Sequence, residues 1–240
     1  MTKTTKRWLI IAISLILIGG LIFSGVMSVF SWDFKKLSTV DCVTKSYEIT
    51  EEFKNININT ITCDIEILPS DKAVVECYES EKEEHSVKVI DNTLEITVER
   101  KSKNWFIGIN FDTPKITVYI PEKEYDSVTV KNTTGDVKLC DINCKSLDLK
   151  STTGDSSLNN VIVKGKLSDS ITTGDITLKQ CDASELYLKA TTGDITGSLL
   201  SDKVFVTKTT TGHINVPNTL TGGKCDIKVT TGDIKIEIEQ

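Results

Sequence analysis

The feature that most constrains this chain is a repeated tetrapeptide. Thr-Thr-Gly-Asp, or a near copy, occurs six times in the C-terminal half, with intervals of 19, 20, 19, 19 and 20 residues between the glycines. A fixed internal period predicts that one small structural unit is copied along the chain and stacked on its neighbours. The six glycines are Gly135, Gly154, Gly174, Gly193, Gly212 and Gly232.

Apolar residues recur at fixed distances from each glycine. The positions seven before it and two and four after it are mostly apolar, and polar residues lie between them. Such alternation predicts two short strands per copy, each with one inward face. The tetrapeptide between them suits a turn, because glycine reaches positive φ and Thr and Asp side chains bond nearby backbone. The column seven before the glycine contains Val128, Leu147, Leu167, Leu186, Phe205 and Cys225.

This period favours an all-β fold, a parallel β-solenoid built from repeats of 19–20 residues. A propeller blade needs about 40–45 residues, and the Asn ladder of leucine-rich repeats is missing. The expected domain covers residues 48–240, with clear repeats over 128–240 and degenerate coils before them. A β-sandwich of antiparallel hairpins is the alternative, because repeated short strands separated by turns also describe that class.

The N-terminus predicts one transmembrane helix. Residues 8–32 contain no charge, and a helix of that length spans a hydrocarbon core of about 30 Å. The run exceeds the apolar region of a cleaved signal, which favours an uncleaved anchor. Lys3, Lys6 and Arg7 make residues 1–7 the more positive, cytoplasmic flank. Residues 33–47 are then a connector, and the β-domain lies outside the cell membrane as part of a single-pass protein.

Charge and composition exclude several functions. The formal net charge is −6, and the three basic residues of the N-terminus leave −9 on the rest of the chain. Such a domain is not expected to bind nucleic acid non-specifically. Two His and two Arg leave little material for acid–base catalysis, and we expect no cofactor and no metal. The block Gly154-Asp155-Ser156-Ser157-Leu158 resembles a lipase motif, but Ser156 occupies an inward column.

One column of the repeat could be taken for a binding site. Five copies place Asp after the glycine and one places His, so carboxylates would stack about 4.8 Å apart. Calcium suits such oxygens, but the Gly-rich loop of calcium-binding β-helices is missing. We therefore expect solvated turn residues that bond backbone amides. The column contains Asp136, Asp155, Asp175, Asp194, His213 and Asp233.

The seven cysteines allow one disulfide prediction. All lie after the apolar segment, where an oxidising compartment permits disulfides. Cys63 and Cys77 flank Pro69-Ser70-Asp71 and would face each other if residues 61–68 and 73–78 form a hairpin. Cys225, in an apolar column, is expected to be a core residue.

These motifs resemble a known bacterial family. The segments VTVKNTTGDVKL (128–139) and ITVYIP (116–121), with the TTGDI copies, are similar to a β-strand-repeat family called a putative-adhesin domain of unknown function, and to LiaG-type cell-envelope proteins. The resemblance covers about residues 48–240. It implies a membrane-tethered, extracytoplasmic β-repeat domain without established catalytic activity.

The leading hypothesis is therefore a non-enzymatic, membrane-anchored β-repeat protein, either a scaffold of the cell envelope or a factor associated with envelope stress, whose partner is another envelope protein or a cell-wall component. A surface adhesin that binds glycans or host molecules is the first alternative. A short rod on a short connector favours the scaffold, because it would hardly clear a thick wall. A carbohydrate-active β-helix enzyme is the second alternative, because stacked carboxylates on a rod can bind sugar.

Overall fold

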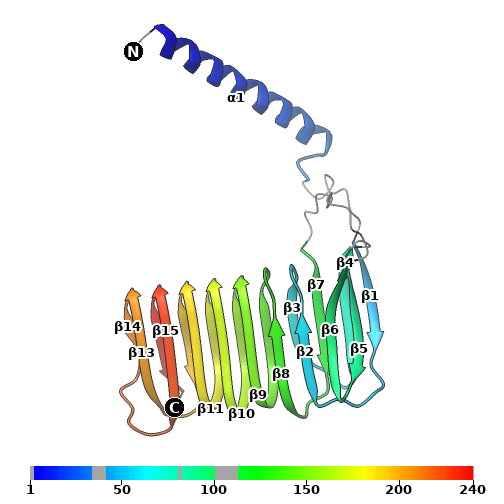
Figure 1. The fold of residues 1–240 in the computed structure, drawn as a ribbon, viewed down its shortest axis with the longest axis vertical. Helices are drawn as coiled ribbons and strands as arrows, with labels where there is room; N and C mark the ends of the chain where they lie inside the picture. The colour runs from blue at the N-terminus through cyan, green and yellow to red at the C-terminus, as the bar shows by residue number, and fades with distance from the viewer. Residues whose placement is uncertain (1–2, 34–41, 81–82, 101–112, 240) are drawn as a thin grey trace. The chain divides into compact units, whose positions relative to one another are not determined.

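A computed structural model describes residues 3–33, 42–80, 83–100 and 113–239. These residues form one helix and sixteen strands, which belong to separate compact units (Figure 1). The elements are α1 (Lys3–Val29), β1 (Cys42–Glu48), β2 (Asn55–Asn59), β3 (Asp64–Pro69), β4 (Val74–Ser80), β5 (Glu83–Ile90), β6 (Thr93–Arg100), β7 (Lys115–Ile120), β8 (Glu124–Lys131), β9 (Val137–Thr153), β10 (Ser156–Thr173), β11 (Ile176–Thr192), β12 (Ile195–Leu199), β13 (Lys203–Thr211), β14 (Ile214–Asn215), β15 (Gly223–Thr231) and β16 (Ile234–Ile238).

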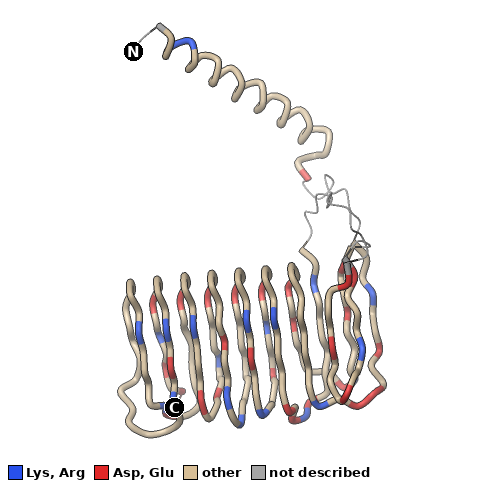
Figure 2. Tube along the Cα trace, in the orientation of Figure 1, with Lys and Arg blue, Asp and Glu red and all other residues tan. Residues whose placement is uncertain are grey.

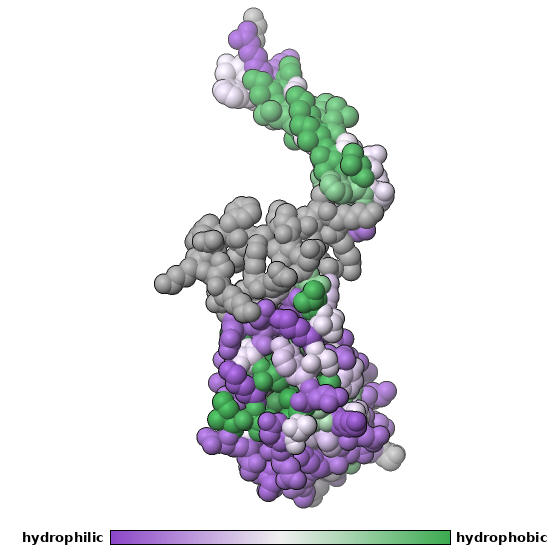
Figure 3. Space-filling model, turned by 90° about the vertical axis from the view of Figure 1, so that its right-hand side faces the viewer, coloured by the Kyte–Doolittle hydropathy of each residue, from purple (hydrophilic) through white to green (hydrophobic). Residues whose placement is uncertain are grey.

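Helix α1 is apolar on all sides. Its segment Thr4–Val29 has a mean hydropathy of 2.7 and is long enough to cross a membrane. Figure 3 shows apolar side chains along most of its length. The helix ends at Val29, within three residues of the predicted end at Trp32. Such a segment fits either a single-pass anchor or a signal sequence.

The central repeats form the coils of a solenoid. Each of β9, β10 and β11 runs along one side of the stack, turns a corner and continues along the other side (Figure 1). Asp141, Asn160 and Gln180 adopt positive φ at this corner, where the chain bends and the pairing between coils is locally irregular before it resumes along the other side. The two short strands predicted between successive tetrapeptides are therefore one bent strand in these coils.

Strand pairing between the coils is parallel and in register. Leu167 of β10 lies opposite Leu147 of β9 and Leu186 of β11, so the same position of each repeat stacks on the next. Parallel pairing confirms the predicted β-solenoid, and the alternative sandwich of antiparallel hairpins is wrong.

The spatial order of the coils differs from their order in the sequence. At the C-terminal end, β15 lies between β11 and β13, and β16 lies between β12 and β14. The copy around Gly212 is therefore the outermost coil, although another copy follows it in the chain. At the other end, β2 lies between β6 and β8, and β3 lies between β7 and β9.

The strands before β8 only partly follow the predicted coils. Strands β2, β3, β6 and β7 stack in parallel as predicted, whereas β1 pairs antiparallel with β4, and β5 pairs antiparallel with β6. The predicted connector, residues 33–47, is shorter than expected because β1 takes up its last part. Residues 34–41 of that connector lie outside the described residues.

The core fills the space between the two sides of each coil. The predicted inward columns are buried in every copy except the one around Gly212, apart from Gly197, which is partly buried. There, Ile214 is 44% exposed, because an outermost coil has no further coil to cover it. Cys225 is fully buried as predicted, and burial raises the pKa of its thiol to about 12.

The predicted hairpin around Pro69 is wrong. Strand β7 lies between β3 and β4, because Ile116 pairs with Ile65 on one side and with Cys77 on the other. Cys63 and Cys77 are therefore not cross-strand neighbours, and the structure has both as free, buried thiols. The Cα atoms of residues two strands apart lie about 10 Å from each other, beyond the reach of a disulfide.

Candidate functional site

The aspartate column forms a continuous ladder along one corner of the solenoid. One carboxylate oxygen of each Asp, Oδ1, accepts a hydrogen bond from the backbone amide of the equivalent residue in the next coil. The distance is 2.8 Å from the Asp155 amide to Asp136 and 2.7 Å from the Asp194 amide to Asp175. The ladder therefore holds successive turns together. In spatial order it contains Asp64, Asp136, Asp155, Asp175, Asp194, Asp233 and His213.

The two ends of this ladder explain its exceptions. Asp64 begins it, so the segment Thr62-Cys63-Asp64 is a seventh, degenerate copy of the tetrapeptide that the sequence analysis missed. His213 ends it, in the outermost coil, where no further amide needs an acceptor. The amide and side chain of His213 hold the pKa of Asp233 below its usual range.

The glycine column lets the coils approach closely at this corner. Gly193 has a φ of 136°, and a Cβ atom there would lie 2.0 Å from the carbonyl oxygen of Gly174. Only glycine fits that distance and that conformation. The repeated tetrapeptide therefore forms the same turn in each coil. Its carboxylates accept backbone hydrogen bonds along the stack and do not converge on one point.

A second column, which the sequence analysis did not identify, carries positive charge. Four residues before the repeat glycine, five of six coils place an exposed lysine on the side formed by β8, β15, β13 and the second halves of β9, β10 and β11. We call this side the lysine face. Among the blue segments in Figure 2, one row lies at a common height on neighbouring strands. In spatial order the column reads Lys131, Lys150, Ser170, Lys189, Lys228 and Lys208.

Most of the charge in this lysine column is uncompensated. Among the described residues, Lys131, Lys189 and Lys208 make no ion pair. Lys150 lies 3.1 Å from Asp148, and Lys228 lies 2.9 Å from an Asp226 oxygen. The backbones of neighbouring coils lie about 4.8 Å apart, so the exposed ammonium groups repel one another by at most about 1 kcal/mol per neighbouring pair at the dielectric constant of water. The column is therefore a line of positive charge that is open to an anion.

Two shallow hollows lie along the lysine column. One, of about 290 Å³, includes Lys166, Tyr187, Lys189 and Lys228 in its lining. The other, of about 210 Å³, is lined by Lys189, Lys228 and Lys208 with neighbouring threonines. Lys166 Nζ lies 4.5 Å from the centre of the Tyr187 ring, which places a further cation beside the first hollow.

The opposite face of the same coils has a different surface. Its outward column is of mixed chemistry, and Lys138 there is neutralised by Glu66 at 2.9 Å, while Lys235 lies 3.1 Å from Glu237. Lys115 and Lys138 lower the pKa of Glu66. From β3 to β14 this column reads Glu66, Lys138, Ser157, Thr177, Thr196, Lys235 and Asn215.

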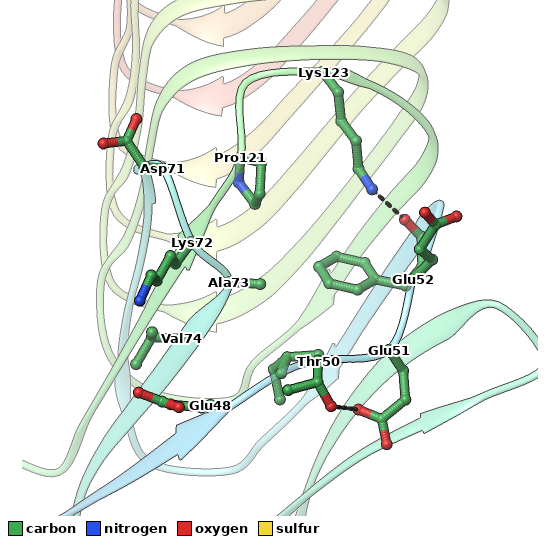
Figure 4. Close-up of a pocket in the computed structure, with 12 residues that line it drawn as sticks. Glu48, Thr50, Glu51, Glu52, Asp71, Lys72, Ala73, Val74, Pro121 and Lys123 are labelled. Atoms are coloured by element: carbon green, nitrogen blue, oxygen red, sulfur yellow. Dashed lines mark hydrogen bonds between the residues drawn. The ribbon is translucent and has the colours of Figure 1, made fainter.

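A larger opening, of about 390 Å³, lies beside the loop between β1 and β2. In Figure 4 the carboxylates of Glu51 and Glu52 lie on one side of it and those of Glu48 and Asp71 on the other. Lys123 already fills its cationic position: Nζ donates to the Phe53 carbonyl at 2.8 Å and lies 5.0 Å and 5.2 Å from the Phe53 and Tyr125 rings. Through these contacts Lys123, the residue before β8, fastens this loop to the start of β8.

One buried cluster has donors that suit a metal. Ligand atoms of Cys77, Glu79 and His85 lie within 4.8 Å of one another. However, Glu79 Oε2 accepts hydrogen bonds from the His85 amide at 2.5 Å and pairs with its Nδ1 at 2.8 Å, while Lys45 Nζ lies 3.1 Å from Oε1. The carboxylate is thus already compensated by an ion pair and two hydrogen bonds.

A second buried polar pair interrupts the core of β10. Ser156 donates a hydrogen bond to Asp169 at 2.5 Å, and Asp169 is 1% exposed. Burial raises the pKa of Asp169 to about 7, against the opposing effect of the Ser156 hydrogen bond. Ser156 points inward as predicted. The lipase-like block is a corner followed by a strand, with Asp155 exposed in the ladder and Ser156 and Leu158 in the core.

The comparisons with known proteins agree with this architecture. Residues 53–240 match the Toastrack DUF4097 family. A "putative cell adhesion protein" of Clostridium sporogenes is 14% identical, with 83% of this chain and 100% of that chain covered and a TM-score of 0.50. A "putative adhesin" of Bacteroides fragilis is 18% identical, with 82% and 97% covered and a TM-score of 0.49. The comparison with curated proteins gave no match.

The family match covers the whole repeat region and most of the strands before it. The resemblance to the putative-adhesin domain of unknown function is thereby confirmed. The Clostridium structure, at 14% identity, supports the fold alone. This chain belongs to the Toastrack DUF4097 family.

Proposed function

We propose that the protein is a non-enzymatic, membrane-anchored solenoid whose lysine face binds an anionic component of the cell envelope. The lysine column carries this proposal. Five exposed lysines recur at an outward position where the fold needs no particular residue, in a chain with a net charge of −6. Repetition of a like charge at that spacing is unfavourable without a ligand.

In this proposal helix α1 anchors the solenoid at the outer side of the cell membrane. Helix α1 is uncharged from Trp8 onward, and Lys3, Lys6 and Arg7 make its N-terminal flank the cytoplasmic one. In cell fractionation the intact chain should pellet with membranes, and protease added outside should remove its C-terminal domain once the wall is stripped. A shortened form in the medium would show that the segment is a cleaved signal.

A binding role fits the repeats better than catalysis. The aspartates of the corner ladder accept amide hydrogen bonds from neighbouring coils, and Asp169 and Ser156 are closed within the core. The groups that a carbohydrate-cleaving rod would use as acids are thus engaged in holding the fold.

The role of the lysine face can be tested with two residues of β11. Lys189 lies on the lysine face and Lys179 on the opposite face, and both are exposed. The full chain in non-ionic detergent should bind phosphocellulose, a matrix that carries phosphate groups. We expect Lys189→Glu to elute at clearly lower salt and Lys179→Glu, with the same change in net charge, to elute near the wild type. Equal elution of the two variants would overturn the proposed role of the face.

A further inference from the structure

We propose that the ligand of the lysine face is an extended polyanion that lies along the solenoid axis, across successive coils. This inference rests on the proposed function and names the shape and charge of the ligand. A single anion would need one cluster of cations, whereas the lysine column is a line. With strands about 4.8 Å apart, the six positions from Lys131 to Lys208 span roughly 24 Å.

The surroundings of the lysine column make this line narrow. Two positions toward the start of each strand, the next outward column contains Asp148, Tyr187 and Asp226. On the other side the neighbouring outward column is threonine in every coil, from Thr133 to Thr210. The positive track is therefore one residue wide. One edge has carboxylates at two of its six positions, Asp148 and Asp226, and the other edge has hydroxyls at every position; the rest of the first edge is Thr129, Ser168, Tyr187 and Val206.

A narrow track distinguishes a polymer from a membrane surface. A flat anionic bilayer laid on the lysine face would meet Asp148 and Asp226 together with the lysines, and repulsion from the carboxylates would offset part of the attraction. A single chain can follow the lysines and avoid the acids. The face also lacks arginine, and lysine ammonium groups bind as point charges without fixed geometry. Such groups suit a flexible chain whose charges shift along the track.

The two hollows supply places for successive charged groups. Both include Lys189 and Lys228, so they lie next to each other along the track. The first also contains Lys166 and the hydroxyls of Ser168 and Ser170, together with Asp226, whose carboxylate is paired with Lys224 and Lys228. Neighbouring units of one chain could then each meet at least two lysines.

Ser170 interrupts the line between Lys150 and Lys189, which allows a gain of binding to be tested. Ser170→Lys would complete a run of six cations. Ser157 lies on the same strand, β10, but on the opposite face, and it is also half-buried. Ser157→Lys is therefore a control with the same substitution, strand and net charge.

The experiment measures binding of the full chain, in non-ionic detergent, to inorganic phosphate, short-chain polyphosphate and long-chain polyphosphate by calorimetry. We expect affinity to rise with chain length until the polymer spans the track, and to be weakest for inorganic phosphate. Ser170→Lys should tighten long-chain binding several-fold and steepen its dependence on log salt by about 0.7, the value per phosphate for single-stranded nucleic acids. Ser157→Lys should change both quantities little.

Three outcomes would overturn the inference while the proposed function stands. Affinity per phosphate could be independent of chain length, the two lysine variants could gain equally, or vesicles with anionic lipid could bind more tightly than polymer of equal charge. In each case the retention on phosphocellulose would still depend on Lys189. Loss of that dependence would instead remove the proposed function itself. Thermal unfolding of each variant shows whether the fold is intact.

Discussion

The lysine face and the opposite face are made by the same coils around the same core, yet their outward columns differ. Strand β11 contributes to both, with Lys189 on one face and Lys179 on the other. Inward residues recur because every coil must fill the same space. Outside the turn tetrapeptide, whose exposed Thr and Asp belong to the turn, no such demand acts on outward positions, and the column from Glu66 to Asn215 varies accordingly. Recurrence at an outward position, as in the lysine column, therefore points to something other than the fold.

The largest effect is expected from a substitution in the core, which the two faces share. Leu186 is fully buried between Leu167 and Cys225. Leu186→Asp would place a carboxylate in that column without a partner, and we expect a loss of more than about 4 kcal/mol in the free energy of unfolding. Lys189→Asp, three residues later on the surface, should change the melting temperature little. Equal melting temperatures would show that the strand register is wrong.

A somewhat smaller effect is expected at the corner that joins the two faces. Gly193→Ala brings a Cβ atom against the Gly174 carbonyl at a φ of 136°, and should cost about 3 kcal/mol or more. Urea unfolding measures the loss. Gly20→Ala in α1, where no atom lies within 4 Å of the added Cβ, is the control. A Gly193 variant as stable as the wild type would contradict the close approach of the coils.

The core between the faces should respond to pH through Asp169. Its folded pKa, about 7, lies above the value of about 4 expected in the unfolded chain, so folding favours the protonated form. The contribution of Asp169 to stability is present below pH 4, falls as the pH rises to 7 and is then constant. Urea midpoints between pH 4 and 8 measure it, in comparison with Asp169→Asn. The same pH profile in both would mean that another group is responsible.

The smallest expected effect is a difference in stability between a variant in the interior of the aspartate ladder and a variant at its end. Asp175→Ala removes the acceptor for the Asp194 amide and should cost about 1 kcal/mol, whereas His213→Ala removes no acceptor and should be neutral. Thermal unfolding compares the two.

Calcium tests the other interpretation of the same ladder. At millimolar concentration it should leave the melting temperature of the wild type nearly unchanged, because the carboxylates are engaged by amides. A rise of several degrees in the melting temperature that vanishes in the double variant Asp175→Asn, Asp194→Asn would instead show a cation site.

Much of the missing surface chemistry could have been read from the repeat. The position four before each glycine gives Lys131, Lys150, Ser170, Lys189, Lys208 and Lys228 in the sequence itself. Its signal is weaker than that of the apolar and acidic columns, because exposed lysines are common on strands and Ser170 interrupts the series. Asp64 was harder to find, because Cys63 replaces the glycine and the interval to the next copy, Gly135, is far from the period.

The sequence by itself determined the solenoid, its inward columns and its turn, because period, alternation and glycine geometry are local properties that each copy repeats. The tertiary structure alone decided the order of the coils at both ends. Lys228 lies between Lys189 and Lys208, and β2 lies between β6 and β8, since parallel neighbours can be any two coils whose edges and side chains match. Local patterns do not distinguish among coils that are nearly identical, so only packing of the whole stack selects which of them becomes the exposed end.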